Sequence, residues 1–291
     1  MKQPSVSVIG LGPMGAPIAD NLLAAGTAVT VWNRTASTAA PFGERGARVA
    51  LTPADAAADI ILSVLPDVPQ LEALLDAETV RAWGARRARL VIMSTSSPAK
   101  VRYLAERLAP HGITVLDAPM SGGDRGARAG TLSIMVGGAE SDFDAITPVL
   151  NTIGTTIRHL GDVGTGSLAK LCNQMVVAGT LTALAEAFSL AARCDLNLDH
   201  LREILHGGLA SSAVLDLKGD KLLHREYPLG GSALNQLKDL RYARQSADEA
   251  GARAPMLTLL EQLFTEVVDR DLGAQDHAVV QEILRDDDIT R

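Results

Sequence analysis

The spacing of apolar positions changes about halfway along the chain. Over the first 160 residues, short runs rich in β-branched residues alternate with stretches rich in Ala and Leu. The runs predict strands at Ser5–Ile9, Ala28–Trp32, Ile60–Leu65, Leu90–Ser94, Thr114–Leu116 and Ser133–Val136. Helical patterns lie between several of these runs, for example at Pro17–Ala25 and Pro98–Ala109. This alternation predicts a mostly parallel sheet with helices on both faces.

Helix-length patterns dominate from about Gly164 onwards. They predict helices at Ser167–Cys194, Asp199–Leu205, Ala233–Ala250, Pro255–Asp269 and His277–Leu284. We therefore expect an α/β domain over residues 1–163 and an all-α domain over residues 164–291. The first of these helices would join the two domains and run for roughly 40 Å. Because that exceeds the need of a small domain, we expect part of it to pack against a partner subunit.

Composition and charge narrow the function classes. The 291 residues carry 27 Lys and Arg against 34 Asp and Glu, a net charge of −7, which disfavours a nucleic-acid partner. Two cysteines and the lack of a signal-peptide pattern favour a cytoplasmic location. The apolar stretch Leu171–Ala192 contains several polar residues, so we interpret it as a buried helix and not a membrane span. The six histidines show no paired spacing, so we expect no metal site.

A glycine-rich turn follows the first predicted strand. It comprises Gly10, Leu11, Gly12, Pro13, Met14 and Gly15, and it opens a helix. In this context Gly10 allows a tight turn, Gly12 lets the backbone approach a pyrophosphate, and Gly15 lets helix and strand pack closely. The helix N-terminus then offers free N–H groups to phosphate oxygens. The pattern predicts a dinucleotide site, with a glycine-rich turn that binds nothing as the alternative.

The residues after the second predicted strand indicate which dinucleotide binds. A carboxylate for the ribose 2′-hydroxyl is typical of NAD sites, but this chain has Asn33, Arg34 and Thr35 there. Arg34 can pair with a 2′-phosphate, while Asn33 and Thr35 can donate hydrogen bonds. We therefore expect NADP(H) to be preferred over NAD(H), unless Arg34 is simply a solvated loop charge.

Two further segments carry groups suited to catalysis. Lys170, Asn173 and Gln174 share one face of the long predicted helix. The nearby helix N-terminus and burial should both lower the pKa of Lys170, which suits it to proton transfer with a carbonyl oxygen. Ser121-Gly122-Gly123 exposes backbone N–H groups and a hydroxyl that can hold a carboxylate, although a plain turn would have the same residues.

These motifs, taken together and in order, resemble the β-hydroxyacid dehydrogenase family, which includes 3-hydroxyisobutyrate dehydrogenase and semialdehyde reductases. The resemblance runs from Val6 to about His277. It rests on the glycine turn, Leu65-Pro66-Asp67, Ser94-Thr95-Ser96-Ser97-Pro98, Asp117 to Gly123 with Gly126 and Gly130-Thr131-Leu132, the Lys170 helix, and Lys238-Asp239-Leu240.

The resemblance implies a Rossmann-type N-terminal domain, an all-α C-terminal domain like that of 6-phosphogluconate dehydrogenase, and a homodimer or homotetramer. It assigns the acid/base role to Lys170 and the substrate carboxylate to Ser121, Gly122 and Gly123. It places Leu65, Pro66, Thr95 and Lys238 at the cofactor. Asp239 would orient Lys238, although a simple ion pair on a helix surface would also explain both residues.

Two positions depart from the family pattern. The family has two asparagines after the lysine, where this chain has Asn173-Gln174, and the second normally binds the substrate. Gln174 would carry its amide about 1.5 Å further, one single bond. Members also have a Phe about seven residues before the second lysine, where this chain has Gly231. We therefore expect a substrate bulkier than glyoxylate.

The leading hypothesis is an NADP(H)-dependent oxidoreductase that interconverts a short carboxylated 3-hydroxy acid, or a related hydroxy acid, with its semialdehyde. An imine reductase shares the architecture, but retention of Lys170 and of the Ser121 loop favours a carboxylate-bearing substrate. A non-catalytic NADP(H)-binding sensor or scaffold is the alternative from another class.

Overall fold

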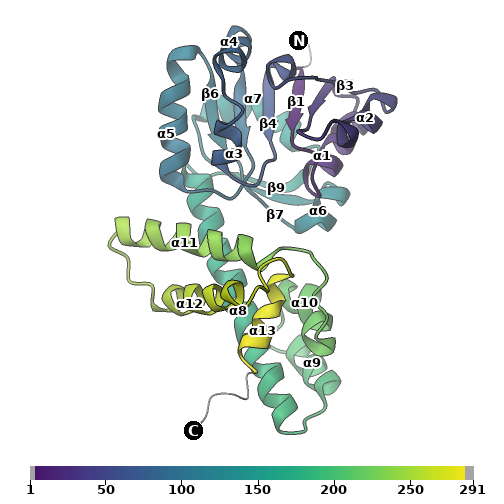
Figure 1. Cartoon of the computed structure of the whole chain (residues 1–291), viewed down its shortest axis with the longest axis vertical. Helices are drawn as coiled ribbons and strands as arrows, with labels where there is room; N and C mark the ends of the chain where they lie inside the picture. The colour runs from purple at the N-terminus through teal and green to yellow at the C-terminus, as the bar shows by residue number, and fades with distance from the viewer. Residues whose placement is uncertain (1–3, 286–291) are drawn as a thin grey trace. The chain divides into compact units, whose positions relative to one another are not determined.

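The computed structural model describes residues 4–285, and packing divides the chain into two compact units at Lys170/Leu171. The division falls inside one long helix, α8 (Thr165–Arg193). The first unit is an α/β structure and the second is helical, as the sequence predicts (Figure 1). The expected domain limits, 1–163 and 164–291, remain a proposal beside this division by packing.

The first unit is built on a six-stranded parallel sheet. Its strands are β1 (Val6–Ile9), β2 (Val29–Trp32), β3 (Arg48–Val49), β4 (Ile60–Ser63), β5 (Arg89–Ile92) and β6 (Thr114–Asp117). The strand order is β3-β2-β1-β4-β5-β6, and every neighbouring pair is parallel. The order reverses at β1, which is the topological switch point where doubly wound sheets bind ligands. This is a Rossmann-type sheet.

Alternate residues of the strands pack on opposite faces of this sheet. Val6 and Val8 belong to a core with α1 (Gly15–Ala24) and α2 (Ala36–Glu44). Ile9 belongs to a second core with α4 (Ala77–Ala85) and α5 (Pro98–Leu108). The period of two explains why both faces are covered. Two short elements, η1 (Ala54–Ala56) and α3 (Val68–Glu72), lie in the connections.

A second, smaller sheet carries the last part of the first unit. It contains β7 (Met120–Ser121), β8 (Leu132–Val136) and β9 (Gly154–His159), with α6 (Gly123–Ala129) and α7 (Glu140–Leu150) between the strands. The predicted strand at Ser133–Val136 is real but lies in this sheet and not in the large one. An antiparallel bridge between Asp117 and Gly137 joins the ends of β6 and β8.

The second unit is all helical. After α8 come α9 (Leu198–Gly207), α10 (Ala213–His224), α11 (Ala233–Glu249), α12 (Pro255–Asp269), η3 (His277–Val279) and α13 (Val280–Ile283). They share one apolar core that includes Phe188 of α8, Leu222 of α10 and Phe264 of α12. The single helix predicted at His277–Leu284 is a 3-10 turn followed by one short α-helical turn.

Helix α8 is long and apolar enough to cross a membrane, with a mean hydropathy of 1.6, but 44% of that window is buried inside the protein. A core helix of a soluble protein passes the same test, so this helix is weak evidence for a membrane span.

Candidate functional site

The predicted cofactor residues gather along one edge of the large sheet. The glycine turn follows β1, Asn33 follows β2, Leu65 follows β4 and Thr95 follows β5. Because all of these strands are parallel, their carboxyl ends lie at the same edge. The four segments are therefore neighbours in the fold although they are spread over about 90 residues of sequence.

The glycine turn has no room for side chains where it packs on the strands. Gly10 has φ +96°, and a Cβ there would lie 2.7 Å from the carbonyl oxygen of Val64. A Cβ at Gly15 would lie 1.9 Å from the carbonyl oxygen of Gly10. A Cβ at Gly12, in contrast, would meet none of the described atoms within 4 Å. Two glycines are thus required by packing, and the third leaves an open backbone at the start of α1.

Asn33 braces the glycine turn from the end of β2. Its Oδ1 accepts a hydrogen bond of 3.0 Å from the Leu11 N–H, and its Nδ2 donates to the carbonyl of Thr35 at 3.1 Å. The carboxamide therefore fixes the shape of the turn. Arg34 next to it is exposed, and it makes no ion pair within residues 4–285.

The loops after β4 and β5 are tied to each other. The Ser96 hydroxyl donates a 2.5 Å hydrogen bond to Oδ1 of Asp67, and both side chains are buried. Asp67 also caps α3 by accepting from the Val68 N–H. This link fixes the segment that contains Thr95 against the segment that follows Leu65 and Pro66.

Asp117 joins the end of β6 to the start of α8. Its side chain is fully buried and accepts hydrogen bonds from the N–H groups of Gly164 at 2.7 Å and Ser167 at 2.5 Å. A carboxylate at this position meets the positive end of the helix dipole. A Cβ at Gly166 would lie 2.2 Å from the carbonyl oxygen of Met135, so β8 and α8 approach as closely as backbones can. The first turn of α8 is thereby fixed to the ends of β6 and β8.

Lys170 lies on α8 five residues after Thr165, and only 7% of it is exposed. The helix begins two residues earlier than the sequence predicts, and Asp117 neutralises its N-terminal charge. Because the dipole acts mainly on the first turn, it has little effect on Lys170, which lies beyond that turn.

The Ser121-Gly122-Gly123 segment forms a backbone turn between β7 and α6. Ser121 pairs with Ser133 of β8, while Gly122 and Gly123 are exposed and have φ +124° and +62°. These positive φ values turn the chain away from the strand. The segment thus presents main-chain atoms and a hydroxyl without bulky side chains.

In the helical unit, Gln174 belongs to a network of buried amides and charges. Its Nε2 donates to Oδ2 of Asp239 at 2.9 Å and lies 3.5 Å from Oε1 of Gln236. Oδ1 of Asp239 forms an ion pair with Nζ of Lys238 at 2.9 Å. Asp239 is only 4% exposed, so this pair is not a surface ion pair. Asn173 is its neighbour on α8 and is partly buried.

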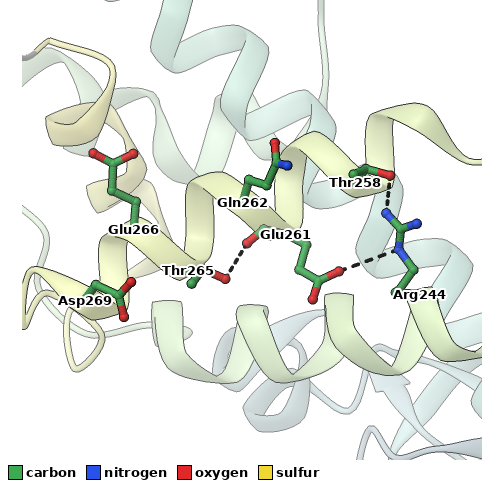
Figure 2. Close-up of a pocket in the computed structure, with 7 residues that line it drawn as sticks. All are labelled: Arg244, Thr258, Glu261, Gln262, Thr265, Glu266 and Asp269. Carbon is green, nitrogen blue, oxygen red and sulfur yellow. Dashed lines mark hydrogen bonds and ion pairs between the residues drawn. The ribbon is translucent and has the colours of Figure 1, made fainter. Parts of the chain in front are cut away.

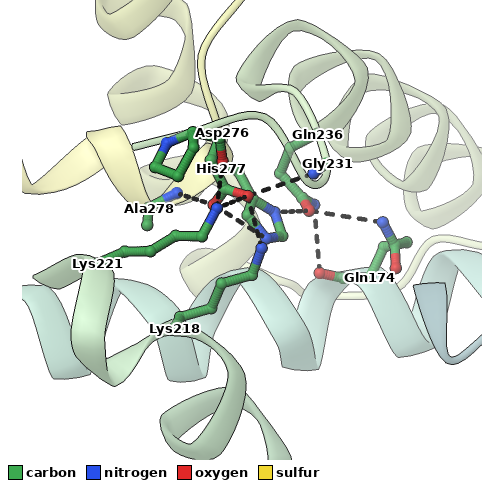
Figure 3. Close-up of polar contacts among 9 residues, drawn as sticks. Gln174, Lys218, Lys221, Gly231, Gln236, Asp276, His277 and Ala278 are labelled. Atoms are coloured by element: carbon green, nitrogen blue, oxygen red, sulfur yellow. Dashed lines mark hydrogen bonds and ion pairs between the residues drawn. The ribbon is translucent and has the colours of Figure 1, made fainter. Parts of the chain in front are cut away.

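Asp276, which was not among the predicted site residues, joins α10 to the start of η3 in this unit. Figure 3 shows its Oδ2 facing two lysines of α10, Lys218 at 2.7 Å and Lys221 at 2.9 Å. Its Oδ1 accepts from the Ala278 N–H at the start of η3. Burial raises the pKa of Asp276, but the hydrogen bond and charge of Lys218, the Ala278 amide and His277 outweigh it and hold the pKa at about 2.

An open pocket of about 600 Å³ lies on α11 and α12. Figure 2 shows its lining residues, Arg244, Thr258, Glu261, Gln262, Thr265, Glu266 and Asp269. None of them was predicted as a site residue, and Arg244 and Glu261 already pair at 3.6 Å. Within residues 4–285 there is no group of three His, Cys, Asp or Glu side chains that could hold a metal ion.

Comparisons with known proteins show the family of this chain. Residues 5–161 match the NAD binding domain of 6-phosphogluconate dehydrogenase. Residues 164–284 match the NAD-binding domain of NADP-dependent 3-hydroxyisobutyrate dehydrogenase. The chain belongs to the β-hydroxyacid dehydrogenase family. It is therefore an enzyme, an oxidoreductase of the 3-hydroxyisobutyrate dehydrogenase type with NAD(P)-binding domains.

Several members of the β-hydroxyacid dehydrogenase family are similar over nearly their whole length. The 2-(hydroxymethyl)glutarate dehydrogenase of Eubacterium barkeri is 33% identical, over 96% of this chain and 94% of that protein. The 2-hydroxy-3-oxopropionate reductase of Escherichia coli (strain K12) is 34% identical over 95% of each. The structure of Mycobacterium tuberculosis 3-hydroxyisobutyrate dehydrogenase with L-serine superposes with a TM-score of 0.85 at 29% identity, covering 98% of this chain and 100% of that one.

The glycine turn of this family member fits a dinucleotide. The missing Cβ of Gly12 leaves space for a ligand against the backbone, and Met14 stands at the N-cap of α1 without a side-chain cap. The first turn of a helix that lacks a cap can donate its N–H groups to phosphate oxygens.

Proposed function

We propose that the protein is an NADP(H)-dependent reductase that converts a short carboxylated semialdehyde into the corresponding hydroxy acid, or runs the reverse oxidation. The observation that carries the proposal is the buried Lys170 on a helix that Asp117 fixes to the end of β6, the strand that leads into the Ser121 loop. An acid/base group and a carboxylate-binding turn are the two elements that this reaction needs from the protein.

The cofactor phosphates would be held by residues 10–15, and the adenosine ribose would lie near Asn33, Arg34 and Thr35. Further contacts would come from Leu65, Pro66 and Thr95 along the edge of the sheet. Lys238 on α11 would also contact the cofactor. The bound nicotinamide supplies or accepts the hydride. Arg34 supports a preference for NADP(H), because an exposed guanidinium without an ion pair in the described chain is available to a 2′-phosphate.

Lys170 would serve as the general acid in reduction and as the general base in oxidation. Lys170 is almost fully buried, and burial disfavours the charged form of an amine. In reduction, the lysine ammonium would give a proton to the carbonyl oxygen as the hydride reaches the carbonyl carbon. In oxidation, the neutral amine would take that proton back.

The substrate carboxylate would lie on Ser121, Gly122 and Gly123. The two exposed glycines leave the backbone N–H groups accessible, and the serine hydroxyl adds a donor. Asn173 and Gln174 follow Lys170 on the same face of α8, so an amide from this pair would orient the reacting oxygen.

NADPH consumption across a panel of aldehydes tests the proposal. Glyoxylate, tartronate semialdehyde, methylmalonate semialdehyde and succinic semialdehyde carry a carboxylate, and butanal is the uncharged control. We expect turnover with at least one acid and a kcat/KM at least about 100-fold lower for butanal, because the anchoring charge is missing. Equal turnover of butanal, or of a cyclic imine in its place, would favour the imine reductase. NADPH binding without any turnover would favour the sensor.

The size of the substrate depends on Gly231. A Cβ there would meet no described atom within 4 Å, so an aromatic side chain can be accommodated locally. We expect Gly231→Phe to lower kcat/KM for succinic semialdehyde relative to glyoxylate about tenfold. Gly207→Phe is the matched control, because a Cβ at Gly207 is equally unobstructed. An unchanged ratio would show that residue 231 does not limit substrate size.

We also propose a homodimer or homotetramer in the cytoplasm. Val176 and Leu190 on α8 are 67% and 65% exposed, which supports a partner subunit covering this helix. Cys172 and Cys194 are free thiols, as suits a reducing compartment.

A further inference from the structure

Gln174 is the position where this chain departs from the asparagine pair of its family, and its side chain is committed within the helical unit. Its Nε2 donates to Oδ2 of Asp239 at 2.9 Å and has a longer contact of 3.5 Å with Oε1 of Gln236. Both acceptors belong to α11, and both residues are almost fully buried. If the Gln174 amide turned away, the buried carboxylate of Asp239 would lose a donor, and the loss of a hydrogen bond to a buried charge is costly.

Gln236 also contacts the backbone of Gln174 and the ring of His277. Its Nε2 donates to the backbone carbonyl of Gln174 at 3.4 Å, and its Oε1 lies 3.1 Å from Nδ1 of His277 (Figure 3). An amide oxygen only accepts, so Nδ1 of His277 carries the proton in this contact. Gln236 is 2% exposed and His277 is 9% exposed. The network therefore fixes which end of each carboxamide faces which partner.

Asp239 links this hydrogen-bond network to Lys238. Its second oxygen, Oδ1, pairs with Nζ of Lys238 at 2.9 Å, and that ammonium also lies 5.4 Å from the centre of the Tyr242 ring. The Asp239 side chain is 6% exposed and the Lys238 side chain 24% exposed. The buried carboxylate of Asp239 thus accepts the Gln174 amide on one oxygen and pairs with the partly exposed Lys238 ammonium through the other.

The length of the side chain at residue 174 decides whether this link forms. Asparagine is shorter by one carbon–carbon bond, about 1.5 Å. From the same backbone it could not span the 2.9 Å contact to Asp239. A glutamine is therefore matched to Asp239 at this position.

We propose that Gln174 is a positioning residue that orients the Asp239–Lys238 pair for the cofactor, and that Asn173 is the amide that orients the substrate. This inference rests on the proposed function, because it takes Lys238 to contact NADP(H). It differs from the family pattern, in which the second amide contacts the substrate.

Variants at residue 174 test this role in the full-length protein. We expect Gln174→Asn and Gln174→Met to raise both the Kd and the KM for NADPH about tenfold, the size of one lost hydrogen bond to a buried charge. The KM for the preferred semialdehyde should change less than about twofold. The double variant Gln174→Asn/Asp239→Asn should bind NADPH no more weakly than Asp239→Asn alone, because both changes break the same link.

Gln245→Asn is the matched control. Gln245 lies on α11, is exposed, and donates to Glu249 at the same distance of 2.9 Å. We expect it to leave the NADPH Kd and both KM values unchanged. Thermal unfolding of every variant confirms that binding is measured on folded protein.

A rise in the KM for the semialdehyde with an unchanged NADPH Kd would overturn the inference and make Gln174 a substrate ligand. Unchanged values for both would also overturn it. The NADPH Kd of Lys238→Met shows whether the inference about Gln174 fails alone or the proposed cofactor role of Lys238 fails as well. If Lys238→Met weakens NADPH binding and Gln174→Asn does not, the inference alone fails. If neither weakens it, the cofactor role of Lys238 fails.

Discussion

In the proposed function, the preference for NADP(H) depends most directly on Arg34. We expect Arg34→Ala to raise the Kd for NADPH about tenfold, since one charge-assisted contact to the 2′-phosphate is lost. The Kd for NADH should stay within about twofold, because NADH lacks that phosphate. Fluorescence titration of each nucleotide measures both constants.

Arg45→Ala is the control for this change. Arg45 is similarly exposed, but it is already paired with Asp20 at 2.7 Å. Its removal should affect neither nucleotide. If Arg34→Ala weakens the binding of NADPH and NADH equally, Arg34 does not contact the 2′-phosphate.

Single residues differ in how far the sequence reveals them. The spacing of Gly10, Gly12 and Gly15 is a local signal, and the structure shows the tight turn it predicts at Gly10 and the close packing it predicts at Gly15. The partners of Gln174 are not local, because Gln236 and Asp239 lie more than 60 residues away. Their pairing depends on how α8 and α11 pack. The sequence signal for this pairing is that the chain has Gln174, with a longer side chain, where the family has an asparagine.

At the scale of an element, the start of α8 depends on Asp117. Each of its two carboxylate oxygens accepts one N–H, so Asp117→Asn would turn one acceptor into a donor that faces another donor. We expect this variant to lose about 2 kcal/mol of unfolding free energy. Urea unfolding at neutral pH measures the loss.

Asp162→Asn gives the comparison for that change. Asp162 is exposed and lies just before α8, so it tests the effect of removing a nearby charge alone. We expect a loss below about 0.5 kcal/mol. If the two variants are equally stable, Asp117 does not hold the helix as we describe.

The elements themselves were predictable where their pattern was long or strongly β-branched. The predicted strands at Ser5–Ile9 and Ala28–Trp32 match β1 and β2, and the predicted helix Pro255–Asp269 matches α12. The strands β3 and β7 were not predicted, because they are two residues long and too short for a periodic signal. The six-residue strand β9 was not predicted either, because Ile157 is its one large apolar residue and half of the strand is exposed. Also missed was α10, where Gly219 interrupts the pattern although Ser212 provides a helix-capping signal.

At the scale of the whole molecule, the first unit has an apolar core on each face of its sheet and the helical unit has one core. In the helical unit, Asp276 joins α10 to η3. Its side chain is fully buried, and its pKa is lowered from 3.8 to about 2. A carboxyl whose pKa is lower in the folded state stabilises the fold above its unfolded pKa. That stability, about 2 kcal/mol, should be lost as the pH falls from 4 towards 2.

The difference in unfolding free energy between wild type and Asp276→Asn isolates this contribution. We expect the difference to shrink by about 2 kcal/mol between pH 5.5 and the lowest pH at which both proteins are folded at low urea. Asp220→Asn, which removes an exposed carboxylate paired with Arg202, should show a much smaller change. A constant difference at every pH would mean that Asp276 does not carry this charge in the folded state.

The most direct test of the account compares wild type and Lys170→Ala with NADPH and the preferred semialdehyde. We expect kcat to fall at least about 100-fold, because the proton donor is lost. The Kd for NADPH should stay within about twofold, since Lys170 is not among the proposed cofactor contacts. If Lys170→Ala keeps the wild-type kcat, Lys170 is not the acid/base group and the proposed mechanism is wrong.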